Sequence, residues 1–221
     1  METLNNIVLT IQNYMSNYVL IIALLGAGLW FSFRLGFIQV RGFGEGMKRT
    51  FGGLFSKKGE AGADGMSSFQ ALATAIAAQV GTGNIAGAAT ALAIGGPGAI
   101  FWMWIAAFLG MATIYAEAIM AQKYKTVGAD GQVTGGPVYY IRAAFKGTFG
   151  KVLAGIFAIL ITLALGFMGN AVQSNSIAAS FHTAFGIPQW IMGLVVAVIA
   201  IFVFMGGMKR IAKVTETIVP F

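Results

Sequence analysis

Gln79-Val-Gly-Thr-Gly-Asn84, inside the apolar stretch that runs from Phe69 to Ile94, is the segment that decides the fold. A membrane helix normally satisfies its own backbone groups, because hydrocarbon offers no partner for them. Gly81 and Gly83 flank Thr82 and weaken the helix where weakening is most costly. We therefore predict a discontinuous helix near residues 79–84, as in ion-coupled transporters. The alternative is that these small residues only pack closely against a neighbouring helix.

The composition around this segment is that of a membrane protein. The 221 residues are 57% hydrophobic and 10% charged, with 31 glycines and 18 phenylalanines. We predict an all-α polytopic membrane helix bundle, because several apolar segments are long enough to cross a hydrocarbon core of about 30 Å. The predicted spans are residues 18–33, 69–94, 99–121, 152–180 and 187–205, with a sixth beginning at 214, all within a single membrane domain 1–221.

The positive charges predict the orientation. All 14 lysines and arginines fall within residues 34–58, 123–151 and 209–213, which follow the first, third and fifth spans. By the positive-inside rule, these loops are cytoplasmic and the N-terminus lies outside, in a cell (plasma or inner) membrane. Spreading the cations over separate loops argues against a nucleic-acid partner.

Five spans and the start of another match an inverted repeat whose second half is absent. We therefore expect the natural chain to be longer, with the second repeat beyond Phe221 as part of the same protein.

The predicted break offers two kinds of backbone group. Amides at the start of the outer half-helix favour a carboxylate, and the helix dipole adds to this preference. Carbonyls that end the inner half-helix, from Ala77 to Val80, favour a cation or an ammonium group. Asn84 adds an amide oxygen, which sodium accepts as a ligand. A zwitterionic amino acid beside a sodium ion fits this polarity.

Two further features lie inside spans. Asn170 and Gln173 share a helix face at mid-depth, and polar amides in lipid must face protein or a cavity, so we assign both as substrate contacts. The neighbouring Asn175 and Ser176 are explained equally well as hydrogen-bond partners between helices. Glu117 is the one carboxylate within a complete span, which makes it a candidate proton relay or ion ligand.

Several stretches resemble the alanine or glycine:cation symporter family. They are Ala77-Ala-Gln-Val-Gly-Thr-Gly-Asn-Ile-Ala-Gly, Gly95-Gly-Pro-Gly-Ala-Ile-Phe-Trp-Met-Trp, Glu117 and Gly135-Gly-Pro-Val-Tyr-Tyr-Ile. Gly81-Thr-Gly-Asn is also similar to the break in the first core helix of neurotransmitter:sodium symporters. The resemblance implies a five-plus-five inverted-repeat fold with one extra N-terminal helix. The charge pattern independently requires such a helix.

The resemblance also implies a role for each residue of the break. Thr82 and Gly83 would offer amides to the substrate carboxylate, and the Gln79 carbonyl would hold the ammonium group. Asn84 would bind sodium, and the carbonyls of Ala77 and Val80 would bind a second sodium. Glu117 would brace the broken helix from behind, which we rank above proton transfer.

We expect a secondary active transporter that imports alanine or glycine with sodium by alternating access around the Gly81–Asn84 break. The residues leave open sodium or proton as the coupling ion, and alanine or glycine as the substrate. Two alternatives are a passive channel and a membrane sensor or subunit that binds an amino acid without moving it. An enzyme is not expected, because the sequence has no phosphate-binding loop, no nucleophile paired with a base and no metal cluster.

Overall fold

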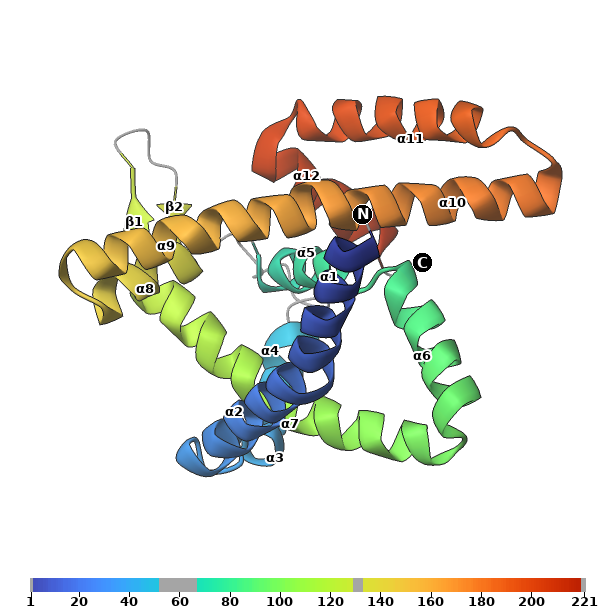
Figure 1. Cartoon of the computed structure of the whole chain (residues 1–221). Coiled ribbons are helices and arrows are strands. Elements are labelled where there is room, and N and C mark those ends of the chain that lie inside the picture. Colours follow the sequence, from blue (N-terminus) through green and yellow to red (C-terminus); the bar gives the residue numbers. More distant parts are fainter. Residues whose placement is uncertain (1, 52–66, 129–132, 220–221) are drawn as a thin grey trace.

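The computed structural model describes residues 2–51, 67–128 and 133–219. These residues form helices and one short β-ribbon (Figure 1), which confirms the predicted all-α class. Lys57 and Lys58, two cations of the first basic stretch, lie outside the described residues.

The chain begins with one long helix that packs on α7 (Gly98–Lys123). Its parts are α1 (Glu2–Tyr14), the π-helical η1 (Met15–Leu20) and α2 (Ile21–Arg34), so the helix starts well before the predicted span. Gly28 permits close packing, because a Cβ there would lie 2.9 Å from Leu109. Ser32 is fully buried and donates to the Gly28 carbonyl at 2.7 Å.

Two short helices follow the first long helix, α3 (Ile38–Arg41) and α4 (Phe43–Phe51). Gln39 of α3 donates to Ser32 Oγ at 2.6 Å and to the Phe108 carbonyl of α7 at 3.2 Å. These bonds tie the end of the first helix to the middle of α7.

The predicted discontinuous helix is present as two pieces, α5 (Ser68–Gln79) and α6 (Thr82–Gly95). At 1.5 Å per residue they measure about 18 and 21 Å, so neither crosses a membrane alone. Ser67 precedes α5 and caps it with a capping box, in which the Ser67 hydroxyl accepts from the Gln70 backbone amide at 3.1 Å. In Figure 1, α6 leads from the break to one end of α7.

A short antiparallel ribbon follows α7. Strands β1 (Thr126–Val127) and β2 (Val133–Thr134) pair Thr126 with Thr134. The ribbon leads into α8 (Pro137–Ala144), which packs on α9 (Gly147–Ile161).

The second half of the chain is built on another long helix. The π-helical η2 (Thr162–Gly169) joins α9 to α10 (Asn170–Phe185) without interruption. Then α11 (Gln189–Phe204) runs back beside α10 (Figure 1). Helix α12 (Gly207–Ile218) turns sharply away from the end of α11. The angle between α11 and α12 is 119°. Helix α12 thus begins before Val214, the predicted start of the sixth span.

Three helical stretches among the described residues are long and apolar enough to cross a membrane. They are Thr3–Arg34, Gly98–Lys123 and Gly147–Phe185, and the bent pair α11 and α12 adds a fourth if it is counted as one span. The described core is small, with Ala73, Ala112, Ala154, Ala178, Met192 and Ala212 as its buried hydrophobic residues. Most large apolar side chains face outward, as expected of helices in lipid. The polytopic membrane bundle is confirmed, while the exact span boundaries stay a prediction.

Candidate functional site

The break between α5 and α6 consists of two extended residues. Val80 has φ −93° and ψ 111°, and Gly81 has φ −135° and ψ 179°. Both residues are outside the helical region, so the peptide groups on either side lose their intrahelical partners. The carbonyl end of α5 and the amide end of α6 therefore meet at this point, which is the arrangement that the sequence predicts.

Gln173 of α10 reaches across to the start of α6. Its Oε1 accepts a hydrogen bond from the Thr82 backbone amide at 3.0 Å and another from Thr82 Oγ1 at 2.8 Å. A Cβ on Gly81 would collide with Gln173 Nε2. Gly81 therefore lets Gln173 approach, whereas a Cβ built on Gly83 would have no atom of the described residues within 4 Å.

Asn84, in the first turn of α6, bonds back across the break to the end of α5. Its Nδ2 donates to the Gln79 carbonyl at 3.1 Å, and its backbone amide donates to the Gly81 carbonyl at 3.0 Å. The first bond joins the residue predicted to bind sodium to the carbonyl predicted to hold the ammonium group. It also directs the Asn84 amide so that Nδ2 faces α5, which leaves Oδ1 as the acceptor of this side chain.

The remaining residues predicted for the break are exposed. Ala77 and Gln79 lie in the last turn of α5, Val80 follows it, and Gly83 lies in the first turn of α6. Carbonyls in the last turn of a helix and amides in the first turn have no partner within the helix. The polarity needed for a cation on one side and a carboxylate on the other is thus present, although no contact tests the individual roles.

Asn170 does not share the contact that Gln173 makes. Its Nδ2 donates to the Gly166 carbonyl of its own helix at 3.0 Å. Gly166 belongs to η2, which ends immediately before Asn170. The extra residue of a π-helical turn often marks a functional site. The substrate role of Asn170 stays a prediction.

Glu117 lies away from the break and meets the helix that follows the β-ribbon. Tyr140 of α8 donates to Glu117 Oε1 at 3.5 Å. Burial raises the pKa of the Tyr140 phenol, and the charge of Glu117 and this hydrogen bond raise that pKa further. In this structure Glu117 links α7 to α8, and its predicted bracing of the broken helix stays a prediction.

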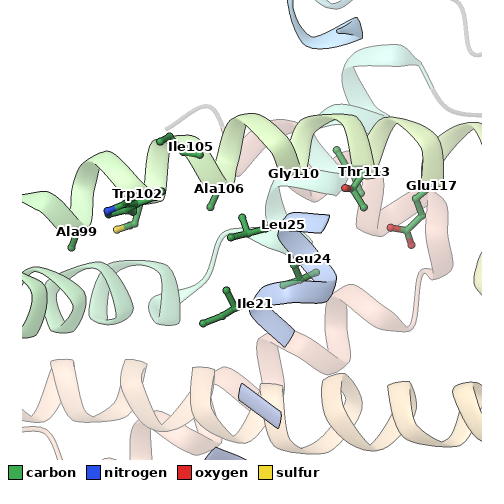
Figure 2. Close-up of a pocket in the computed structure, with 12 residues that line it drawn as sticks. Ile21, Leu24, Leu25, Ala99, Trp102, Ile105, Ala106, Gly110, Thr113 and Glu117 are labelled. Carbon is green, nitrogen blue, oxygen red and sulfur yellow. The ribbon is translucent and has the colours of Figure 1, made fainter. Parts of the chain in front are cut away.

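An apolar groove of about 720 Å³ runs between the first helix and α7. Figure 2 shows Ile21, Leu24 and Leu25 facing α7 across it, with Thr113 and Glu117 along α7. None of the residues that line the groove belongs to the break. The hydrogen-bonding groups at the break, and not this apolar groove, identify the candidate site.

The contacts between α5 and α12 were not predicted. Gln70 Nε2 of α5 donates to Glu216 Oε2 of α12 at 2.8 Å, and the Thr74 and Thr215 hydroxyls lie 3.1 Å apart. The Ser67-x-x-Gln70 pattern could have revealed the start of α5. The pairing with Glu216 joins residues far apart in the sequence, so no local signal could have revealed it.

Comparison with known proteins gives a consistent result. Residues 1–221 match the family model described as the sodium:alanine symporter family. The chain is 44% identical over 218 residues to the sodium/alanine symporter AgcS of Methanococcus maripaludis, covering 98% of this chain and 47% of that protein. It is 48% identical over 198 residues to the putative sodium/proton-dependent alanine carrier protein YrbD of Bacillus subtilis, covering 90% and 39%.

A third relative has a different substrate in its name. The chain is 41% identical over 218 residues to the probable sodium/glutamine symporter GlnT of Bacillus subtilis, covering 99% of this chain and 44% of that protein. The chain thus spans less than half the length of these curated relatives.

Proposed function

Because the chain belongs to the sodium:alanine symporter family, we propose that it forms part of a secondary active transporter that imports alanine or glycine together with sodium. The transporter resides in the cell membrane, with its N-terminus outside and its basic loops in the cytoplasm. A second repeat completes the binding site and supplies the partner against which this part moves.

The observation that carries this proposal is the pair of donors that Thr82 directs at one oxygen atom. The Thr82 amide and hydroxyl both point at Gln173 Oε1, at 3.0 and 2.8 Å. A carboxylate oxygen is a stronger acceptor than an amide oxygen and is favoured at a helix N-terminus. We propose that the substrate carboxylate replaces Gln173 Oε1 on Thr82, with the Gly83 amide as a further donor. Gln173, and Asn170 one turn away, then contact the bound amino acid.

The other half of the break is suited to positive charge. The Gln79 carbonyl, which already accepts from Asn84, would accept from the substrate ammonium group. Asn84 Oδ1 would bind the coupling sodium beside it. The exposed carbonyls of Ala77 and Val80, at the negative end of the α5 dipole, would bind a second sodium. Sodium and substrate then stabilise each other across the break, which couples their binding.

Proton coupling is the second candidate. Two relatives have sodium/proton dependence in their names, and Glu117 is a carboxylate inside the candidate span Gly98–Lys123. We rank sodium first, because every predicted ligand at the break is a neutral oxygen that cannot carry a transferable proton at neutral pH.

The test is uptake of labelled alanine and glycine by the full-length transporter in proteoliposomes. An inward sodium gradient and an inward proton gradient are compared, with empty liposomes as the control. We expect accumulation above equilibrium with sodium. Accumulation with protons alone would move the coupling to Glu117. Equilibration without accumulation would indicate a channel, and sodium-dependent binding without entry would indicate a sensor.

A further inference from the structure

The two halves of the broken helix are held by different elements. The outer half, α6, is bound to α10 through Thr82 and Gln173. The inner half, α5, is bound to α12 through Gln70 and Glu216. We propose that Gln70, Thr74, Thr215 and Glu216, here called the α5–α12 link, position the inner half-helix and so set the geometry of the cation side of the break. This inference rests on the proposed function.

The α5–α12 link is closely packed. Beside the Gln70–Glu216 bond, the Thr74 and Thr215 hydroxyls lie 3.1 Å apart. Ala73 on α5 and Ala212 on α12 are each only 2% exposed, and the two helices pack against each other. Small buried residues let the helices approach closely, and polar pairs between membrane helices fix their relative orientation. The link therefore holds α5 in one position on α12.

Gln70 is itself fixed at both ends of its amide. Its Oε1 accepts from the Ser67 amide at 3.1 Å as part of the capping box, and its Nε2 donates to Glu216. The bond to the backbone at the start of α5 determines which end of the amide faces α12. Through Gln70, Glu216 is therefore connected to the backbone at the start of α5.

A displacement at Gln70 is carried to the break, because a helix of this length is stiff. Gln70 and Gln79 are separated by about 13 Å along the helix axis. Helix α12 is in turn tied to α11, since Arg210 Nη1 donates to the Phe202 carbonyl at 2.9 Å and the guanidinium lies 5.4 Å from the centre of the Phe202 ring. Movement of α12 relative to α10 therefore changes the distance between the carbonyl end of α5 and the amide end of α6.

One substitution at Gln70 disrupts the α5–α12 link and keeps the capping box of α5. Gln70→Glu retains a side-chain oxygen for the Ser67 amide, since glutamate is equally suited to this position. The same substitution places two carboxylates against each other at α12. The exchange Gln70→Glu with Glu216→Gln restores one donor and one acceptor with their positions swapped. Thr217→Val is the matched control, because Thr217 bonds to the Lys213 carbonyl of its own helix and lies outside the α5–α12 link.

The experiment uses the full-length transporter with a reporter, Ala75→Cys, on an exposed position of α5. Residues 1–221 contain no cysteine, and any cysteine elsewhere in the transporter is replaced. We expect Gln70→Glu to change the rate of thiol labelling from the cytoplasmic side about tenfold, the factor of one hydrogen bond to a charged group. We also expect a higher KM for sodium in uptake with a smaller change in maximal rate. The exchange variant restores both, and Thr217→Val changes neither.

Thr74→Val, which removes only the hydroxyl pair, is the second variant in case Gln70→Glu does not fold, and a smaller change in the same direction is expected. Unchanged labelling in the folded variants, or an exchange variant no better than the single substitutions, would overturn the inference. Labelling is measured without transport. A wild-type protein that takes up no amino acid would therefore refute the proposed function and still leave the link testable.

Discussion

Gln173 of α10 lies directly against Gly81 in the break. The extended conformation of Gly81, with φ −135°, is open to any residue, so the reason for glycine here is the space that Gln173 takes. The sequence alone assigned both residues to the site, but it explained Gly81 as a residue that weakens the helix. The contact with Gln173 could not be predicted, since it depends on how α10 crosses α6.

Gly81→Ala is therefore expected to destabilise the protein through a collision with Gln173. Inserting a methyl group into a packed contact costs about 1–3 kcal/mol, and Gly81→Ala combined with Gln173→Ala should recover most of that loss. Thermal unfolding of the purified full-length variants measures both effects. Gly83→Ala is the matched control, because its Cβ meets no neighbouring atom. It should unfold like the wild type while binding substrate more weakly.

A second prediction concerns the Tyr140 phenol. Its pKa is raised, first by burial and then by Glu117, so the protonated phenol is favoured by folding. This contribution to stability is complete below the ordinary tyrosine pKa of about 10 and is lost as the pH rises through the higher pKa of the folded state. The tyrosinate absorbance of the wild type is measured against pH, and that of Tyr140→Phe is subtracted from it. We expect the difference to show a transition above the ordinary tyrosine pKa. In Glu117→Gln the transition should move down only partly, because burial remains.

Local sequence predicts some features of the helices and not others. The break at Val80 and Gly81 agrees with the prediction, because glycines act on the local backbone. The bend of 119° between α11 and α12 was missed, since the apolar residues near Val214 suggest a new span and not a helix packed on α5. The π-helical turns η1 and η2 also have no local signature.

The close packing of the first helix on α7 can be tested by substitution. Gly28→Ala would place a methyl group 2.9 Å from Leu109 and should separate the helices at the cost of about 1–3 kcal/mol. Gly26→Ala is the matched control, because it lies in the same helix with nothing within 4 Å. A lower unfolding temperature for Gly28→Ala alone is the expected result. Equal unfolding temperatures would contradict this packing.

The whole molecule is an open assembly of helices whose large apolar side chains face outward. The chain covers less than half the length of the curated relatives described above, and a second repeat that completes the site and moves against this part belongs to the proposal. The polytopic class and the family could be predicted from composition and motifs. The orientation rests on charge alone and remains to be measured.

Orientation can be tested with single cysteines at the two ends of the predicted topology. Asn5→Cys lies near the start of the first helix, and Lys209→Cys lies in the third basic stretch. A membrane-impermeant thiol reagent applied to intact cells should label the first and spare the second until the membrane is opened. The reverse pattern would invert the topology and place the inner half-helix outside.

The most direct test of the account is equilibrium binding of labelled alanine to the purified full-length transporter at increasing sodium concentration. We expect binding to require sodium. The sodium concentration for half-maximal binding should rise about tenfold in Asn84→Ala, as for the loss of one interaction with a charged group, and alanine affinity should fall in Gln173→Ala. Alanine binding that is equally tight without sodium, or unchanged in both variants, would contradict a sodium and substrate site at the break.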